Sequence, residues 1–138
     1  MSEFSFHSSE RLKHRKLIEH AFAQGKTIKA YPIIMVFHLS ALPEDVPVQV
    51  LFSVPKKRFK RAVDRNLLKR RMREAWRLNR HNFIDVDFDL SQQLAILLIY
   101  TGKEIEPYTR IEEKIILVLR RLKEEHLTSE SSPTSPEE

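Results

Sequence analysis

Residues 62–80 carry the pattern that most constrains this chain, because they have two opposed faces at helical spacing. At about 100° per residue, Leu68, Met72 and Ala75 fall on one side and form an apolar stripe. The opposite side holds a stripe of polar and cationic residues: Asn66, Lys69, Arg70, Arg73, Arg77 and Arg80. The pattern predicts a helix that packs by one face against a core and presents cations by the other.

The cations of this helix continue into the segment before it. Residues 56–80 contain 12 of the chain's 24 Lys and Arg residues and only two acids, Asp64 and Glu74. Like charges at i,i+4 destabilise a helix by roughly 0.2–0.5 kcal/mol per pair, and acids that would relieve this repulsion are nearly absent. Residues 1–123 have a net charge of +10, from 24 basic residues and 14 acids. A body this basic is expected to bind nucleic acid or another anionic surface; the alternative is a solvated helix face.

The composition excludes several classes of site. With 138 residues, 41% of them apolar, the chain suits one domain with one core. It has no Cys, which excludes disulfides and thiolate chemistry, and only two glycines, which excludes a glycine-rich phosphate loop. No run reaches the roughly 18 apolar residues of a membrane span, and the N-terminus lacks the apolar segment of a signal peptide. We therefore expect a cytoplasmic protein.

A first helix is predicted over residues 8–24. Ser8 or Ser9 can cap its start, and Gly25 stands where a left-handed residue often ends a helix. The repeat gives this helix one apolar face, which consists of Leu17, Ile18, Ala21 and Phe22.

Three apolar segments predict strands over residues 33–39, 48–54 and 94–100. Residues 26–31 are expected to be extended, and residues 40–47, which contain two prolines, to form a loop. A basic helix between two of these strands suggests a βαβ unit within an α/β sandwich. The order of elements leaves open whether those two strands are adjacent or parallel.

The last helix is predicted from the capping-box spacing of Thr109 and Glu112. Its apolar stripe consists of Ile111, Ile115, Val118, Leu119 and Leu122. We expect one α/β domain over residues 9–125, preceded by a flexible N-terminus at residues 1–8. Residues 126–138 form an acidic tail that is too polar to pack, so we expect it to be disordered.

The sequence offers little for catalysis. None of the six His residues stands in a metal-binding motif, and no nucleophile has an adjacent base. Asp85, Asp87 and Asp89 alternate with Val86 and Phe88, so their carboxylates could hold Mg²⁺ through oxygen ligands. The alternative is a solvated loop whose two apolar residues turn inward. The protein by itself is therefore not expected to be a catalyst.

The basic helix and the strand before it carry a specific motif. The segment from Phe52 reads Phe-Ser-Val-Pro-Lys-Lys, and the segment from Ala62 reads Ala-Val-Asp-Arg-Asn-Leu-Leu-Lys-Arg-Arg-Met-Arg-Glu-Ala. Together they resemble the protein subunit of bacterial ribonuclease P, whose signature is Ser-Val-x-Lys-Lys at a strand end, then a helix with Arg-Asn-x-x-Lys-Arg-x-x-Arg. The helix motif is matched at every specified position by Arg65, Asn66, Lys69, Arg70 and Arg73.

The resemblance covers roughly residues 11–123, including Arg11-Leu12-Lys13 near the start. It implies a two-layer α/β (α+β) sandwich, with a four-stranded sheet and a left-handed β-α-β crossover. It also implies the noncatalytic protein subunit of a ribonucleoprotein endoribonuclease that removes the 5′ leader of precursor tRNA. In that enzyme the RNA subunit, with Mg²⁺, performs the hydrolysis. The expected partners are ribonuclease P RNA and precursor tRNA, and neither DNA nor a membrane is expected.

The resemblance implies two binding surfaces. Residues expected to bind the RNA subunit are Lys56, Lys57, Arg58, Lys60, Arg61, Arg65, Asn66, Lys69, Arg70, Arg73 and Arg77. Residues expected to hold the leader, in a groove between the sheet and the first helix, are Ile18, Phe22, Tyr31, Val36 and Phe52. Aromatic side chains beside cations suit single-stranded RNA because bases stack on them. The alternative for each leader residue is that it fills the core.

Some alternatives stay open at the level of sequence. Phe59 either stacks on a base or plugs its loop onto the core, whereas Trp76 is expected to pack in the core or at its edge. A general RNA-binding or ribosomal protein would share the basic surface. A DNA-binding protein would place the basic helix in a major groove.

Overall fold

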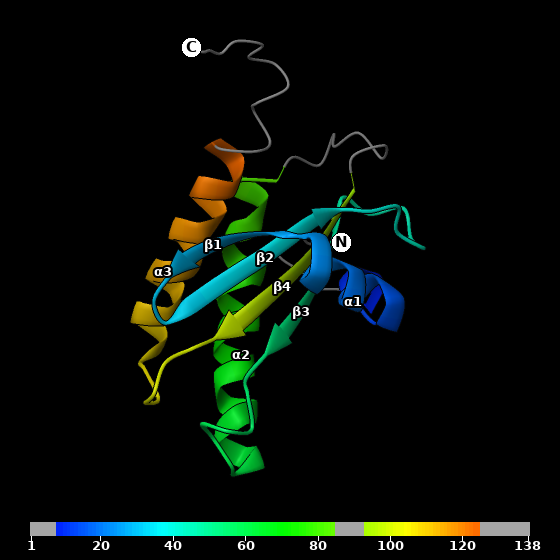
Figure 1. The fold of residues 1–138 in the computed structure, drawn as a ribbon. Coiled ribbons are helices and arrows are strands. Elements are labelled where there is room, and N and C mark those ends of the chain that lie inside the picture. The colour runs from blue at the N-terminus through cyan, green and yellow to red at the C-terminus, as the bar shows by residue number, and fades with distance from the viewer. Residues whose placement is uncertain (1–7, 85–92, 125–138) are drawn as a thin grey trace.

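The computed structural model of the protein describes residues 8–84 and 93–124. Four strands form one mixed sheet within this part of the chain (Figure 1). In sheet order they are β1 (Lys26–Ala30), β2 (Ile33–Leu39), β4 (Leu94–Tyr100) and β3 (Val48–Ser53). The pairs β1–β2 and β2–β4 are antiparallel, whereas β3 and β4 are parallel. The strands predicted from the sequence are therefore confirmed.

The two strands beside the basic helix are adjacent as well as parallel. Val48 pairs with Leu94 and Ser53 with Ile99, and α2 (Ala62–Asn79) connects the two strands. In Figure 1, α2 lies behind the sheet, both strands point downward, and β4 lies to the left of β3. The crossover is therefore left-handed, an arrangement found in only about 2% of such connections. The order of elements left this geometry open, and the family resemblance implied it.

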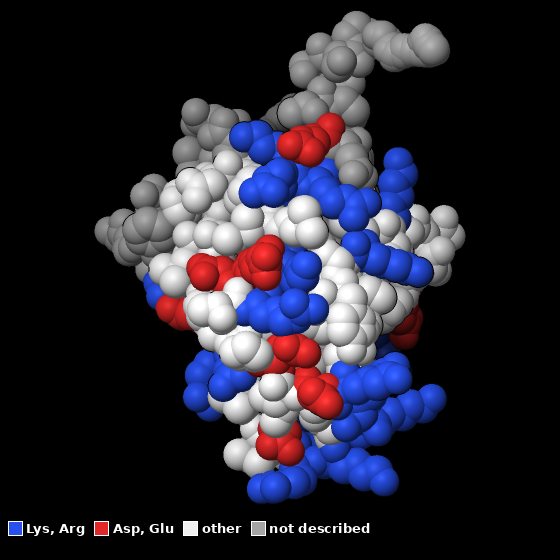
Figure 2. All heavy atoms as spheres, turned by 90° about the vertical axis from the view of Figure 1, so that its left-hand side faces the viewer, with Lys and Arg blue, Asp and Glu red and all other residues white. Residues whose placement is uncertain are grey.

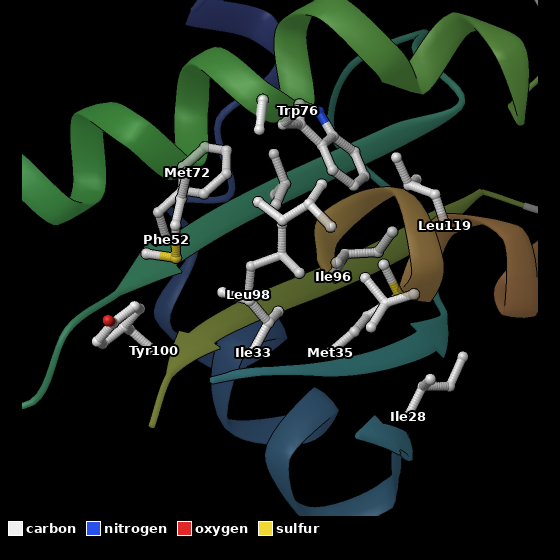
Figure 3. Packing of buried hydrophobic residues seen from close by; sticks show 14 of the residues in the cluster. Ile28, Ile33, Met35, Phe52, Met72, Trp76, Ile96, Leu98, Tyr100 and Leu119 are labelled. Atoms are coloured by element: carbon white, nitrogen blue, oxygen red, sulfur yellow. The ribbon is translucent and has the colours of Figure 1, made fainter. Parts of the chain in front are cut away.

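The sheet is covered on both faces. α2 and α3 (Tyr108–Leu122) pack against each other and against one face, while α1 (Arg15–Gln24) contacts β2 and β4 from the other. The main core lies under α2 and α3, where Trp76, Met72 and Leu119 meet the sheet (Figure 3). A smaller cluster under α1 includes Leu12 and Ala21.

β4 is buried on both faces, which accounts for its continuous apolar sequence. Ile96 and Leu98 point into the main core, and Leu97 belongs to the cluster under α1. The edge strand β3 alternates instead. Its residues Val48, Val50 and Phe52 face α2 and α3.

The first helix is shorter than the sequence predicted. Residues Ser8–Glu10 form a 3-10 turn, the chain then runs extended, and α1 begins only at Arg15. Leu12 N donates a hydrogen bond to Val50 O at 3.1 Å, and the Leu12 side chain is buried. Pairing with the open edge of β3 and burial of Leu12 outweigh the helical repeat. The predicted cap by Ser8 or Ser9 is wrong, because His14 precedes the helix and makes no side-chain cap.

Two other helix boundaries differ from their predictions. Gly25 is extended, with φ −76° and ψ 161°, and not left-handed. A residue with a side chain does not fit at this position, because a Cβ there would overlap the Ala21 carbonyl and lie 2.8 Å from Val36 Cγ1. α3 begins at Tyr108 after Pro107, with no side-chain cap, so the predicted cap by Thr109 is also wrong.

Some predictions fall on residues outside those described. They concern the aspartates at 85, 87 and 89 and the ends of the chain, residues 1–7 and 125–138. Within the described ranges, no helix is both long enough and apolar enough to cross a membrane.

Candidate nucleic-acid interface

The apolar face of α2 fixes the direction of its cations. Leu68, Met72, Ala75 and Trp76 are fully buried beneath the helix. Phe52 on β3 meets Trp76 edge-on, with ring centroids 6.5 Å apart (Figure 3). This packing leaves Asn66 and Arg70 of the polar stripe exposed to solvent, and places Lys69 and Arg73 beside β3.

The cations in the middle of the stripe have different surroundings. Arg70 and Asn66 are exposed, whereas Lys69 and Arg73 are half-buried. The guanidinium of Arg73 lies 6.0 Å from the centroid of the Phe52 ring. Burial, followed by the charges of Arg11 and Arg70, lowers the pKa of Arg73. Positive charges therefore converge around this side chain.

The C-terminal part of the stripe is paired within the protein. Arg77 holds Glu74 through two hydrogen bonds, from Nε at 3.2 Å and Nη2 at 2.6 Å, which lower the pKa of the Glu74 carboxyl. Arg80 Nη2 lies 2.7 Å from Glu10 Oε1, and both side chains are nearly buried. This contact is close in distance but not aligned as a hydrogen bond. Arg77 and Arg80 therefore act first as internal partners.

The loop before α2 is built around Phe59. Its N–H and that of Arg58 both donate to Pro55 O at 3.3 Å, and its ring meets Tyr100 with centroids 5.8 Å apart. Phe59 is 7% exposed, so it plugs the loop onto the core. Arg65 Nη1 donates to the carbonyls of Phe59 and Lys60, each at 2.8 Å. Arg65 thereby holds the loop that precedes its own helix.

The remaining side chains of this loop form an exposed cationic group: Lys56, Lys57, Arg58, Lys60 and Arg61. The loop and the start of α2 lie at the lower end of the molecule in Figure 1. Figure 2 shows the α3 side, where Lys and Arg are interspersed with Asp and Glu over the middle and crowd together at the lower end. The start of α2 and the loop before it therefore present a dense group of exposed cations.

The leader candidates do not share one surface. Phe22 on α1 is 59% exposed, and Ile18 one turn before it is half-buried. Val36 faces α1 but is buried beneath it, while Phe52 faces α2 on the opposite side of the sheet. Tyr31 is 53% exposed in the β1–β2 turn, where its hydroxyl accepts a hydrogen bond from Lys103 N at 3.3 Å. Phe22 and Ile18 are thus the candidates that α1 brings together.

Two cations near the start of the chain were missed as site residues. Arg11 and Lys13 line a groove together with Lys69 and Arg73 of α2. The sequence contained a signal for this, because Arg11 and Lys13 flank an apolar residue in strand-like alternation. The expectation of a helix over these residues obscured it.

The described residues offer little for a metal ion. These ranges contain no group of three or more His, Asp or Glu side chains that could hold a metal ion. His20 and His38 lie with ring centroids 4.6 Å apart, and His38 Nδ1 is 2.8 Å from Ser40 Oγ. Two imidazoles alone do not make a metal centre here.

Comparisons with known proteins agree on one family. The family model described as Ribonuclease P matches residues 6–123. The ribonuclease P protein components of two Porphyromonas gingivalis strains are 35% identical over 119 residues, which cover 86% of this chain and 87% of theirs. The RNase P protein of Thermotoga maritima superposes with a TM-score of 0.65 at 25% identity, covering 81% of this chain and 96% of that one. A Staphylococcus aureus RNase P protein has a TM-score of 0.66 at 19% identity, with coverages of 83% and 95%.

Proposed function

The chain belongs to the ribonuclease P family, and on this premise we propose that it binds ribonuclease P RNA through α2 and the loop before it. Family membership makes it a protein component of a ribonucleoprotein endoribonuclease that acts in tRNA 5′ processing. Its fold is that of the solved family members. We propose that the protein acts in the cytoplasm and that its RNA-binding domain comprises residues 9–125.

The observation that carries this proposal is the convergence of cations with few acids among them. Lys69, Arg70 and Arg73 follow one another along the outer face of α2, while its inner face is buried. The exposed loop cations continue this surface beyond the start of the helix. Arginine suits phosphate because its planar fork can donate two hydrogen bonds to one group. Asn66, which is exposed between these cations, can bond a 2′-hydroxyl or a backbone group.

The leader of precursor tRNA is proposed to bind on the α1 side of the sheet. Phe22 supports this, because an aromatic ring that is 59% exposed is accessible for stacking by an unpaired base. Ile18 lies on the same helix, one turn earlier. Tyr31 offers a second exposed ring at the β1–β2 turn. Val36 supports the position of α1 from below, and Phe52 supports α2 on the other face.

In the proposed division of labour between the two components, the RNA component performs the hydrolysis and the protein binds RNA. We propose that Mg²⁺ acts with the RNA component, and we assign no protein side chain to it. The chain's own residues then do two things: they hold RNA phosphates on α2, and they position the leader beside α1. Both tasks need charge and shape, and neither needs a nucleophile.

Salt-dependent binding tests the α2 surface. The variant Arg70→Gln/Arg73→Gln should bind ribonuclease P RNA more weakly than the wild type, with the log-salt slope reduced by about one per lost phosphate contact. Lys103→Gln/Lys123→Gln is the matched control, because it removes the same charge from two exposed positions elsewhere. Equal slopes for the two variants would refute the assignment. Cleavage of precursor tRNA by the protein without the RNA component would refute the division of labour.

A further inference from the structure

A groove beside α2 is lined on one side by the helix and on the other by the N-terminal segment. Its volume is about 250 Å³, and four cations line it: Arg11 and Lys13 from the N-terminal segment, and Lys69 and Arg73 from the helix. Phe52 and Leu12 supply apolar lining. No acid is among its lining residues, whereas the larger neighbouring hollow around Arg11 and Lys13 includes Glu44.

The backbone explains why the two cations of the N-terminal segment reach this groove. Arg11 forms a parallel bridge with Val50, and Leu12 N bonds Val50 O, so the segment lies along the open edge of β3. Leu12 turns into the cluster under α1 and is 2% exposed. In extended backbone the side chains on either side of it point the opposite way. Arg11 and Lys13 therefore point toward α2.

The position of this segment is fixed on both sides. Before it, Gln49 Nε2 donates to Ser9 O at 2.7 Å, and Glu10 is paired with Arg80 at the end of α2. After it, α1 begins at Arg15 and packs on the sheet. The two walls of the groove are thus held at a set separation before any ligand binds, which lowers the entropic cost of binding.

The cations of the two walls lie close enough to affect one another. Burial, then the charge of Arg11 and then that of Arg70, lower the pKa of Arg73. This side chain therefore experiences positive charge from both the N-terminal segment and α2. An arginine nevertheless stays protonated at any physiological pH. Because the volume lies below the roughly 300–1,000 Å³ of a typical small-molecule site, the groove suits a chain of phosphates better than a bulky ligand.

We propose that this groove binds a segment of RNA phosphodiester backbone, gripped by Arg11 and Lys13 on one wall and by Lys69 and Arg73 on the other. This inference rests on the proposed function for the kind of partner, and adds two contacts and a path to it. The groove lies at the edge of the sheet, between the α2 surface and the α1 side. An RNA strand in it would connect the two surfaces.

The test removes the charge of the wall that α2 does not supply. Arg11→Gln/Lys13→Gln keeps the backbone pairing with β3, and the control Arg120→Gln/Lys123→Gln removes the same charge from two exposed positions at the end of α3. Each protein is titrated, over a series of salt concentrations, with ribonuclease P RNA and with a short unpaired RNA oligonucleotide. The groove variant should lose about 0.7 of log-salt slope per phosphate contact on unpaired RNA, or about one on folded RNA, and the control should lose little.

The two titrations show which kind of RNA occupies the groove. The groove variant should lose log-salt slope only with the RNA whose phosphates bind there. If the groove variant and the control lose the same slope on both RNAs, the inference is wrong. A scan of the oligonucleotide with neutral methylphosphonate linkages supplies a second measurement on the wild-type protein. Linkages that weaken wild-type binding should have no effect on the groove variant, and equal effects on both would also overturn the inference.

Failure of the proposed function is recognised separately. A wild-type protein that neither binds ribonuclease P RNA nor promotes precursor cleavage would sink that function, while the oligonucleotide slopes would still decide the groove. If the double variant unfolds at a lower denaturant concentration than the wild type, Lys13→Gln alone replaces it, because Lys13 is exposed. Lys13→Gln should then show half of the change in log-salt slope expected for the double variant. An unchanged slope in Lys13→Gln would overturn the inference.

Discussion

Arg65 and Phe59 are joined by a hydrogen bond in which Arg65 Nη1 donates to the Phe59 carbonyl at 2.8 Å. The same nitrogen donates to the carbonyl of Lys60, so one guanidinium closes the loop before its own helix. That loop in turn places the Phe59 ring against Tyr100. Arg65 is therefore a structural residue of the cationic surface, besides being a candidate for contact with RNA.

Replacing Arg65 should destabilise the protein. Arg65→Ala removes both bonds to the loop carbonyls, and bonds to charged groups contribute roughly 1.5–3 kcal/mol each when buried. Because this site is only half-buried, we expect a loss of about 1–3 kcal/mol in the free energy of unfolding. Trp76 is the only tryptophan and is fully buried, so its fluorescence reports unfolding in denaturant.

Arg70→Ala is the control for this prediction. Arg70 is exposed, so its loss should change the free energy of unfolding by less than about 0.5 kcal/mol. It should nevertheless weaken RNA binding. If Arg65→Ala unfolds at the same denaturant concentration as Arg70→Ala, the structural role of Arg65 is wrong.

The loop plug gives a second prediction. Phe59→Ala should cost about 3–5 kcal/mol, because it removes a buried ring from the core. Phe22→Ala deletes the same group from a ring that is 59% exposed, and should cost less than about 0.5 kcal/mol. Phe22→Ala should instead reduce the preference for precursor over mature tRNA. Comparable stability losses in the two variants would contradict the assignment of Phe59 to the core and Phe22 to the surface.

The pair of Glu10 and Arg80 gives a third prediction. Glu10→Ala leaves Arg80 nearly buried without its anionic partner, and breaking such a pair typically costs about 3–5 kcal/mol. The exposed pair of Arg15 and Glu19 is the control, since Glu19→Ala should cost less than about 1 kcal/mol. Denaturant unfolding measures both. A double-mutant cycle over Glu10 and Arg80 that returned no coupling energy would show that the two charges act independently.

His38 gives a pH-dependent prediction. Burial, and then the neighbouring His20, lower the pKa of His38 below its ordinary value. The folded state then binds this proton more weakly than the unfolded state, so stability should fall as the pH drops through about 6.5 and be unaffected above it. His20→Asn should raise the pKa of His38 part of the way, because burial remains. NMR titration of the His38 ring measures this, and an unchanged pKa in the variant would exclude coupling between the two rings.

Most of the fold could be predicted because it follows from local patterns. β2 and β4 matched the sequence prediction in full, since each is a continuous apolar segment bounded by polar residues. α2 was recognisable because Leu68 and Met72 recur at helical spacing opposite Arg70 and Arg73. Such signals lie within a few residues of each other and need no tertiary information.

The N-terminal segment could not be predicted in the same way. Its state depends on Val50, which lies 38 residues after Leu12 in the sequence. The Val50 carbonyl, at the open edge of the sheet, accepts a hydrogen bond from Leu12 N. The same limit applies to the site. Sequence spacing placed Arg77 and Arg80 with the other cations, but Glu74 and Glu10 engage them in the folded protein. Which charges pair internally is decided by packing, because it requires knowing which acid lies within reach.

Within the described residues, β4 is the last strand along the chain, yet it lies in the interior of the sheet. β2 and β3 lie on either side of β4, and β3 has no other strand as a neighbour within the described residues. Because a ribosome delivers the chain from its N-terminus, β1 and β2 are the only two of the four strands that can pair with each other before residues 94–100 emerge. The cationic helix α2 is thus synthesised before β4, the strand that joins the two halves of the sheet. The complete four-stranded sheet can form only late in translation.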